Sequence, residues 1–483
     1  MKTSNCPTCG AQVQFRSAGS ALAVCSYCRS TVLRDGARAE DLGKLSEILD
    51  DFSPVQIGTG GKWNAKPFTV MGRLRLKYED GSWNEWAIEF MDGTQGWLSD
   101  ASGQFVVTRL TPATPPAPMA EMRVGRGLSV KGQKYVVTDA RTCVCTGGEG
   151  ELPGPASDGK EFLSVDLRSV GGNGFITFDY SDTPPSVYVG EACARADLAF
   201  TNLRSNEAVG EATSKLKGGV TQFDCPSCGA SLGYHAGFGA SIACKSCKSV
   251  VALEGDRRTV VLKQQELDAR DPFLPLGTKG KLRGDEYEVI GFMSRCDEDG
   301  EAWEEYILFS KGGGFLWLTH SGNDWYLGEV LNALPDERGS EVYYAGKLYR
   351  HESEYTAKTT FVLGEFNWRV KVNDTASVTE WAAGTATLSR ETYGQEVTWT
   401  VNSKWTAAAI AAAFGLPAPP VQAKETSSAG LTWGLIIAAW AVAFLLDGGA
   451  HLMGRGDFFA LIIAAIALWL PMHLSKDEVA SDD

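Results

Sequence analysis

Two features are missing from this sequence: an excess of basic residues, and an apolar run behind a basic N-terminus. The 483 residues include 45 Lys and Arg against 59 Asp and Glu, which gives a formal net charge of -14. Tight binding to polyphosphate needs a basic face that releases counterions, so we do not expect a nucleic-acid partner. The N-terminal residues carry no signal-peptide pattern, and we expect the bulk of the protein to be cytoplasmic.

The composition that is present predicts a chain that is mainly β and has several folded units. A length of 483 residues corresponds to about three or four domains. The 54 glycines and 14 tryptophans favour turn-rich β-structure. Hydrophobic residues alternate with a period close to two in 68–78 and 86–90, with Asp-Gly and Gly-Gly turns nearby. This pattern predicts antiparallel β-barrel or sandwich-like domains.

Eight of the twelve cysteines form two sets of paired CxxC motifs. The sets are Cys6, Cys9, Cys25 and Cys28, and then Cys225, Cys228, Cys244 and Cys247. In each set 15 residues separate the two motifs, and two such turns can supply the four thiolates of a tetrahedral zinc site. We predict two zinc ribbons, each with one structural zinc ion and no position open to water. The alternative is a set of redox-active CxxC pairs.

The two ribbons belong to a tandem duplication with an offset of 219 or 220 residues. The aligned positions include Gly72 with Gly291, Trp83 with Trp303, and Gly148-Glu149 with Gly364-Glu365. Helical periodicity is expected in two connectors and in residues 405–414. The predicted segments are zinc ribbon 1 at 1–36, a helical connector at 37–51, β-domain copy 1 at 52–205, zinc ribbon 2 at 220–255, a connector at 256–270, β-domain copy 2 at 271–415, and a linker at 416–428.

The C-terminal residues differ in character from the rest of the chain. Residues 429–446 and 458–474 are uncharged stretches of 18 and 17 residues, near the lower limit of about 17 for crossing a bilayer. We predict a transmembrane α-hairpin at 429–474, followed by an acidic tail at 475–483; the alternative is two buried helices of a soluble domain. Because zinc-binding thiolates need a reducing compartment, both termini are expected in the cytoplasm.

Three sequence blocks resemble a known family. They are GSWNEWAIEF with GWL at 81–98, EAWEEYILF with LWL at 301–318, and LGEFNWRVKVND at 363–374, of which GGEGELP at 147–153 is a looser version. In these blocks the chain resembles the bacterial domain of unknown function 4178, over 52–205 and 271–415. The resemblance implies no reaction. It implies a setting at the inner membrane, in gene groups linked to membrane stress and polyamines.

Acidic and aromatic residues persist in both copies and form a candidate cation-binding site. They are Trp83, Glu85 and Trp86 in the first copy, and Trp303, Glu305 and Tyr306 in the second. Carboxylates beside ring faces attract cations, so a polyamine or a basic peptide would suit them. The alternative is that the aromatics fill the barrel while the carboxylates face water. Trp83 and Trp86 are three residues apart, so a flat strand would put them on opposite faces and a bulge would bring them together. Cys143, Cys145, Cys193 and Cys296 are interpreted as packed core thiols.

These observations together predict a membrane-anchored, cytoplasmic-facing zinc-ribbon protein of the bacterial inner membrane. We expect it to act as an adaptor or sensor with protein partners there, in envelope stress, and not as an enzyme. The first alternative is a cation or polyamine sensor that uses the acidic-aromatic strands. A third hypothesis is an enzyme with a site between the two copies.

Overall fold

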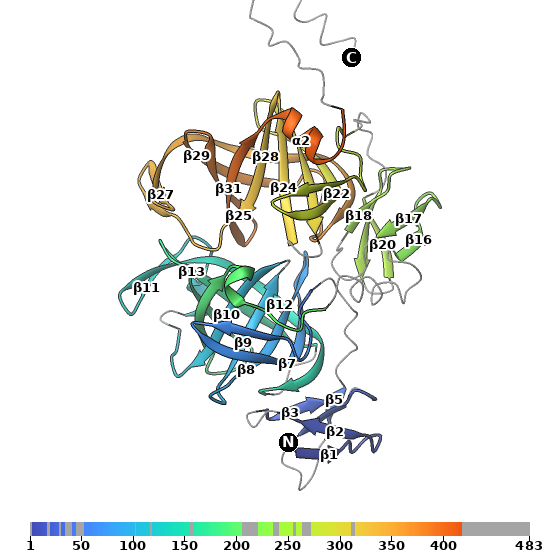
Figure 1. Ribbon diagram of the computed structural model, residues 1–483, viewed down its shortest axis with the longest axis vertical. Helices are drawn as coiled ribbons and strands as arrows, with labels where there is room; N and C mark the ends of the chain where they lie inside the picture. Colours follow the sequence, from blue (N-terminus) through green and yellow to red (C-terminus); the bar gives the residue numbers. More distant parts are fainter. Residues whose placement is uncertain are drawn as a thin grey trace, which may run out of the picture. The chain divides into compact units, whose positions relative to one another are not determined.

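In the computed structural model, the described residues form almost wholly antiparallel strands (Figure 1). It describes residues 2–16, 20–28, 30–33, 41–44, 53–101, 103–115, 118–154, 159–204, 221–234, 241–254, 257–262, 272–310 and 314–417. The predicted transmembrane hairpin at 429–474 and the acidic tail at 475–483 lie outside the described residues, as does nearly all of the predicted linker. Within the described ranges, no helix has both the length and the apolar character needed to cross a membrane.

Each ribbon consists of a two-stranded sheet followed by a second set of short strands. Ribbon 1 contains β1 (Lys2–Asn5), β2 (Gln12–Phe15), β3 (Leu22–Val24), β4 (Ser30–Leu33) and β5 (Asp41–Lys44). Ribbon 2 contains β16 (Thr221–Asp224), β17 (Ser231–Tyr234), β18 (Ser241–Ala243), β19 (Val250–Glu254) and β20 (Arg257–Leu262). In ribbon 1, β1 pairs with β2, and β4 pairs with both β3 and β5. Ribbon 2 repeats this order of pairing.

The first copy, called barrel 1, closes into a ring of eight antiparallel strands. Its elements are β6 (Gly60–Trp63), β7 (Lys66–Lys77), β8 (Ser82–Phe90), β9 (Gln95–Ala101), β10 (Gln104–Thr111), η1 (Met119–Glu121), β11 (Gly127–Val130), β12 (Gln133–Leu152), β13 (Glu161–Ser169), β14 (Gly174–Asp179), β15 (Ser186–Cys193) and η2 (Arg195–Leu198). The ring order is β7, β8, β9, β10, β15, β14, β13 and β12, and β12 pairs back onto β7. Two four-stranded meanders are therefore joined at two seams, β10–β15 and β12–β7.

The second copy, called barrel 2, repeats this ring. Its elements are β21 (Lys279–Leu282), β22 (Asp285–Cys296), β23 (Ala302–Ser310), β24 (Gly314–Ser321), β25 (Asp324–Val330), β26 (Asp336–Arg338), β27 (Glu341–Tyr344), β28 (Lys347–Phe366), β29 (Thr375–Ala383), β30 (Ala386–Tyr393), β31 (Glu396–Trp405) and α2 (Ala407–Ala413). The ring order is β22, β23, β24, β25, β31, β30, β29 and β28, which closes onto β22. The predicted barrel-like copies are thus closed barrels.

The apolar residues of each barrel gather mainly on its outer face. In barrel 1, Trp86, Ile88 and Phe90 pack under residues of β6 and η2, while Val165 and Leu167 pack under residues of β11. In barrel 2, the helix α2 and the strand β27 contribute to the corresponding outer clusters. Because side chains alternate along a strand, the opposite set of positions points inward, and inward side chains of both barrels line one cavity.

The seam that closes each barrel depends on two glycines at a close backbone crossing. A Cβ atom on Gly72 would lie 2.1 Å from a carbonyl oxygen of β12, and one on Gly291 would lie 2.4 Å from a carbonyl oxygen of β28. Their partners Gly150 and Gly364 both have positive φ, +73° and +85°. Only glycine, which has no Cβ, allows this approach, and both copies have glycine at these positions.

The helices predicted for the connectors lie mostly outside the described residues, and the short parts that are described are strands. Inside the predicted helical connector at 37–51, Asp41–Lys44 is strand β5; inside the connector at 256–270, Arg257–Leu262 is strand β20. Pairing with β4 and β19 satisfies the backbone of these segments and overrides the local periodicity. The helix expected at 405–414 is confirmed as α2, whose first turn is capped by the Thr406 hydroxyl, which accepts a 3.1 Å bond from the Ala409 N–H.

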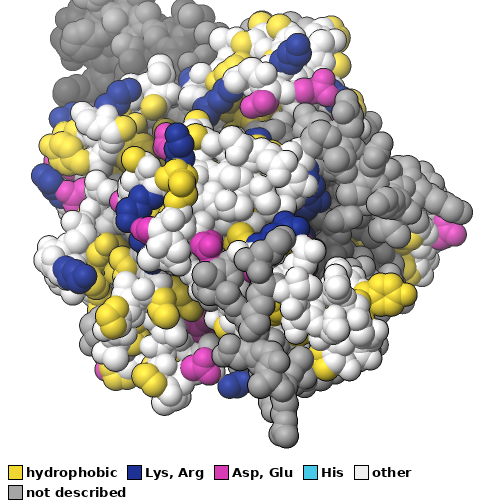
Figure 2. Space-filling model, turned by 60° about the horizontal axis from the view of Figure 1, so that its bottom comes forward, with side chains coloured by type: hydrophobic (Ala, Val, Ile, Leu, Met, Phe, Trp, Pro, Cys, Tyr) yellow, Lys and Arg dark blue, Asp and Glu magenta, His cyan; other side chains and the backbone are white. Residues whose placement is uncertain are grey.

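Charged side chains of both signs are mixed on the surface. On the face drawn in Figure 2, the described Lys and Arg side chains stand among Asp and Glu side chains. Several surface ion pairs bring the two signs together, such as Lys66 with Asp92 at 3.2 Å. This is the arrangement of a solvated surface.

Candidate functional site

Each set of four predicted cysteine ligands forms a compact sulfur cluster. In both ribbons the four Sγ atoms lie within 4.8 Å of one another. In the first set, Cys6 and Cys28 are 3.5 Å apart and Cys9 and Cys25 are 3.7 Å apart; in the second, the corresponding distances are 3.7 and 3.8 Å. A tetrahedral ion with Zn–S bonds of about 2.3 Å has sulfur atoms about 3.8 Å apart. A disulfide would need about 2.0 Å. Each cluster can therefore hold one metal ion, and zinc fits its donors.

The local sequence explains how the first turn of each cluster forms. The Gly10 N–H donates a 2.8 Å bond to the Cys6 carbonyl, and the Gly229 N–H donates the same bond to the Cys225 carbonyl. Both glycines have positive φ, +77° and +75°. The Cys-Pro-x-Cys-Gly pattern therefore supplies a residue that tolerates the left-handed region where the turn needs it.

Each ribbon continues the sheet of the barrel that follows it. In copy 1, Leu22 and Ala23 of β3 pair with the last two residues of β12, and in copy 2 the strand β18 pairs with the end of β28. Leu22 of the ribbon also packs in one apolar cluster with Leu76 and Ala87 of the barrel. Buried Glu151 accepts a 2.7 Å bond from the Arg16 backbone N–H. Ribbon and barrel therefore share both backbone pairing and a core.

The structure divides the six predicted cation-binding residues between two faces of the sheet. Trp86 and Tyr306 are fully buried in the outer clusters. Trp83 and Glu85 of barrel 1, and Trp303 and Glu305 of barrel 2, point inward and line the cavity. The three residues of each copy thus do not share one face, as the flat-strand alternative expected. The reason is the alternation of a regular strand: Leu76 to Arg73 pair with Trp83 to Trp86 without a bulge.

The inward pair of each copy has the same geometry. The Trp83 indole Nε1–H donates a 2.7 Å bond to Glu85 Oε1, and the Trp303 Nε1–H donates a 2.8 Å bond to Glu305 Oε1. Ser99 on the neighbouring strand donates to both oxygens of Glu85, at 2.8 and 2.7 Å. The tryptophan therefore orients a carboxylate toward the interior of each barrel.

Two further carboxylates on the opposite meander face the cavity in each copy, and the sequence pattern did not reveal them. In barrel 1, Asp166 on β13 accepts a 2.7 Å bond from the Thr177 hydroxyl. In barrel 2, Glu380 on β29 accepts a 3.0 Å bond from the Ser389 hydroxyl. In each barrel the acid and its hydroxyl donor lie directly opposite each other on neighbouring strands. The two acids are therefore equivalent.

The third acid is equivalent in the same way. Across the strand pair, Asp179 is paired with the residue two positions before Asp166. In barrel 2, Glu391 is paired in the same way with the residue two positions before Glu380. Both acids line the cavity. Each barrel thus holds an inner triad of carboxylates, which we call the inner acids. They are Glu85, Asp166 and Asp179 in barrel 1, and Glu305, Glu380 and Glu391 in barrel 2.

The inner acids of barrel 1 have raised pKa values. Burial, which is opposed by the bonds from Ser99 and Trp83, raises the pKa of Glu85 to about 7, and the charges of Asp166 and Asp179 add to the rise. Burial also raises the pKa of Asp166 and of Asp179. The carboxylates therefore sit in a poorly solvated interior, where a bound cation would stabilise their charged forms.

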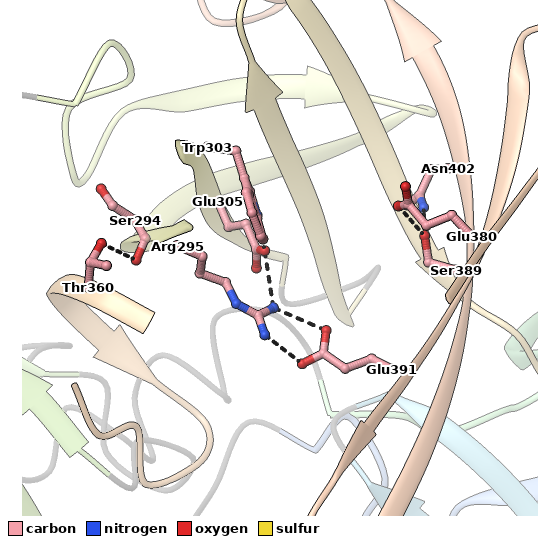
Figure 3. Close-up of polar contacts among 9 residues, drawn as sticks. All are labelled: Ser294, Arg295, Trp303, Glu305, Thr360, Glu380, Ser389, Glu391 and Asn402. Carbon is pink, nitrogen blue, oxygen red and sulfur yellow. Dashed lines mark hydrogen bonds and ion pairs between the residues drawn. The ribbon is translucent and has the colours of Figure 1, made fainter. Parts of the chain in front are cut away.

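Barrel 2 contains such a cation within its own chain (Figure 3). The Arg295 guanidinium lies between two inner acids: it donates one bond of 3.2 Å to Glu305 and two of 3.1 Å to Glu391. Burial lowers the pKa of Arg295, but the charges of Glu305 and Glu391 outweigh this effect and raise it. The third inner acid, Glu380, is bonded by hydroxyls, of which Ser389 is drawn.

The strand register corrects the alignment of Gly148-Glu149 with Gly364-Glu365. Gly150 lies opposite Gly72, and Gly364 lies opposite Gly291, so Gly150 is the counterpart of Gly364. The predicted alignment is two residues out because Gly-Glu occurs twice in succession in this part of β12. Backbone contact decides between two equally good matches in sequence.

The remaining cysteines include the predicted core thiols. Cys143 and Cys145 are 1% and 3% exposed, and burial raises the pKa of the Cys143 thiol far above its ordinary value. Burial also raises the pKa of the Cys193 thiol, to about 11. These thiols are therefore poor nucleophiles at neutral pH.

The family of the chain follows from a match to both barrels. The model of the domain of unknown function DUF4178 matches residues 56–195 and 275–405, more than half of the chain. The chain belongs to the DUF4178 family. The two matched segments coincide with barrel 1 and barrel 2, and each DUF4178 domain follows a four-cysteine cluster. No curated protein and no solved structure matches the chain.

Proposed function

We propose that this protein is a sensor in which a barrel receives a small ligand and the adjoining zinc ribbon presents the response to a protein partner. The observation that carries this proposal is the continuous connection between the two parts. Strand β3 of ribbon 1 pairs with β12, and β12 also supplies part of the inner wall of barrel 1. A movement of the barrel wall on ligand binding would therefore be transmitted through β12 to strand β3 of the ribbon.

The barrel supports a ligand-binding role by its size and lining. A closed barrel of eight strands is just wide enough to hold side chains or one small ligand. In barrel 1 the inner wall carries carboxylates and hydroxyls beside aromatic and aliphatic side chains, while further apolar clusters pack outside. The buried polar groups cost stability, and a bound ligand would offset that cost.

The ribbons support a docking role because each can be fixed by a metal ion while its second cysteine, Cys9 or Cys228, remains exposed. A structural zinc ion stabilises a domain that is too small to have a large core of its own. We further propose that residues 429–474 anchor the chain in the bacterial inner membrane, with the ribbons and barrels in the cytoplasm and protein partners nearby. The uncharged stretches and the thiolate ligands support this arrangement.

The coupling can be tested with metal-site variants of the full chain in detergent. Cys6→Ser with Cys9→Ser should release the metal of ribbon 1 and increase amide hydrogen exchange in β3, β12 and the neighbouring β7. The matched control, Cys225→Ser with Cys228→Ser, should affect β18, β28 and β22 instead. If loss of either metal leaves exchange in the adjoining barrel unchanged, the ribbon and barrel are independent and the sensor proposal is wrong.

The partner can be sought with the same material. Affinity capture from gently solubilised membranes should retain a small set of proteins on the full chain and lose them when all eight ribbon cysteines are changed to serine. Quantitative mass spectrometry provides the readout. Equal capture by the two chains would contradict the docking role of the ribbons.

A further inference from the structure

The two barrels have equivalent inner acids but differ in the side chains that face them, and one difference lies on β7 and β22. On β22, Arg295 lies opposite Trp303; on β7, Leu76 lies opposite Trp83. The tryptophans are equivalent, so Leu76 stands at the position of Arg295. Barrel 1 therefore has the three carboxylates without the guanidinium that bridges two of them in barrel 2.

The cationic side chains inside barrel 1 are engaged elsewhere. Arg141 donates a 2.6 Å bond from Nε to Asp139, and Arg168 donates to backbone carbonyl groups. Within the part of the chain that the structure describes, none of the three inner acids of barrel 1 has an ion pair. Their bonds come from hydroxyl, indole and backbone N–H groups: for example, the Ser181 N–H donates a 2.7 Å bond to Asp179. Dipoles thus solvate these acids, and the charges of Arg141 and Arg168 act on Asp166 without forming an ion pair with it.

The wall beside these acids is aromatic. Half-buried rings of Trp83, Trp97, Phe162 and Tyr188 line the same cavity. Their negatively charged faces attract organic cations and accept the alkyl part of such a ligand. In barrel 2 the guanidinium of Arg295 lies 6.0 Å from the ring centre of Trp303, which is the equivalent of Trp83. The acids and the aromatic wall therefore favour the same class of ligand.

We propose that barrel 1 binds a small organic cation with a guanidinium or primary ammonium head, at the position that the Arg295 guanidinium occupies in barrel 2. This proposal rests on the ligand-binding role proposed above and names the class of ligand. The head group lies between Glu85 and Asp179, the equivalents of Glu305 and Glu391. Barrel 2 carries its own cation and does not take the ligand. The duplication has thus produced one receiving barrel and one self-occupied barrel.

The test is isothermal titration of the full chain in detergent with two probes, agmatine and spermidine. Agmatine offers a guanidinium and an ammonium group, whereas spermidine offers ammonium groups alone, so the two probes distinguish the head groups. We expect one binding site per chain. Glu85→Gln should weaken binding about tenfold or more because it removes one carboxylate of a buried charge pair. The matched control Glu305→Gln, in barrel 2, should leave binding unchanged.

Exchanging the residues at this position gives a sharper test. Leu76→Arg should place a guanidinium among the inner acids of barrel 1 and abolish binding. The reciprocal Arg295→Leu should open barrel 2 and raise the stoichiometry from one to two. Leu76→Met controls for the change of shape and should bind as the unaltered chain does. Circular dichroism and metal content confirm that each variant is folded.

Three outcomes would overturn the proposal: no heat of binding from either probe at millimolar concentration, binding that survives both Glu85→Gln and Leu76→Arg, or loss of binding in Glu305→Gln equal to that in Glu85→Gln. None of these outcomes bears on the metal-dependent coupling of ribbon and barrel, which is measured without a ligand. Failure of the ligand assignment and failure of the sensor proposal are therefore distinguishable.

Discussion

The same substitution at equivalent positions of the two barrels should have opposite effects on stability. Glu85 and Glu305 both accept a bond from an inward tryptophan, but only Glu305 has an arginine partner. Burial raises the pKa of Glu85 to about 7, against about 4.3 for an ordinary glutamate. Between the unfolded pKa and about pH 7, the folded barrel therefore holds a proton that the unfolded chain has already released.

The sign and size of the effect follow from this difference. One pKa unit corresponds to about 1.4 kcal/mol, so ionised Glu85 costs the fold about 3 kcal/mol at pH 8. The cost is absent below the unfolded pKa and is complete once the pH has risen through the folded pKa. Glu85→Gln has no charge to bury. The stability of the variant relative to the unaltered chain should therefore increase by about 2 kcal/mol as the pH rises from 5 to 8.

Glu305→Gln should change stability in the other direction. Arg295 is 6% exposed, and the substitution removes one of its two carboxylate partners while the other, Glu391, remains. A hydrogen bond to a charged group contributes about 1.5 to 3 kcal/mol, so the variant should lose about that amount at neutral pH. Equivalent residues thus give a gain in barrel 1 and a loss in barrel 2.

Amide hydrogen exchange of the full chain measures both effects locally. Peptides from β8 report on barrel 1 and peptides from β23 report on barrel 2, and intrinsic exchange rates correct for pH. Local opening avoids the assumption that a chain with several domains unfolds in one step. If Glu85→Gln leaves the protection of β8 equally changed at pH 5 and pH 8, Glu85 is not held protonated and our account of the barrel 1 interior is wrong.

Three further predictions concern the metal, the barrel seam and the ligand. Metal removal by a chelator should unfold the ribbons first, seen as loss of exchange protection in β3 and β18 before β9 and β24; simultaneous loss would contradict it. Gly72→Ala should destabilise barrel 1 by about 1 to 3 kcal/mol in urea unfolding, because its Cβ would meet a backbone oxygen, while Gly154→Ala, in open space, should have little effect. Agmatine affinity should rise about tenfold from pH 6 to pH 8 as Glu85 ionises, whereas a flat profile in titration calorimetry would exclude Glu85 from the site.

Much of the fold was predictable because its signals are local. The CxxC spacing places two sulfur atoms on one turn, so Cys6 and Cys9 identify a metal site without any knowledge of the rest of the chain. Period-two alternation marks strands, and the repeat of 219 residues reveals that the second copy must fold like the first. Local periodicity did not reveal the strands Asp41–Lys44 and Arg257–Leu262 inside the connectors, because these strands form by pairing with β4 and β19.

The candidate site was only half predictable because its members come from distant strands. The Trp-x-Glu pattern of Trp83 and Glu85 is visible in sequence, but alternation alone does not say which face of the strand points inward. Asp166 and Asp179 join Glu85 only through the β10–β15 and β12–β7 seams that close the ring. No local pattern specifies such long-range pairing.

The sequence by itself determined the two cysteine clusters, the β character and the duplication, since each depends on residues that are close together or repeated at a fixed offset. The tertiary structure alone decided that Leu76 and Arg295 face the inner acids, and that among the described residues one carboxylate triad is bridged by an arginine while the other is not. The physical reason is closure: a barrel brings the inner faces of all its strands around one cavity, and what a side chain meets there is fixed by register across the ring.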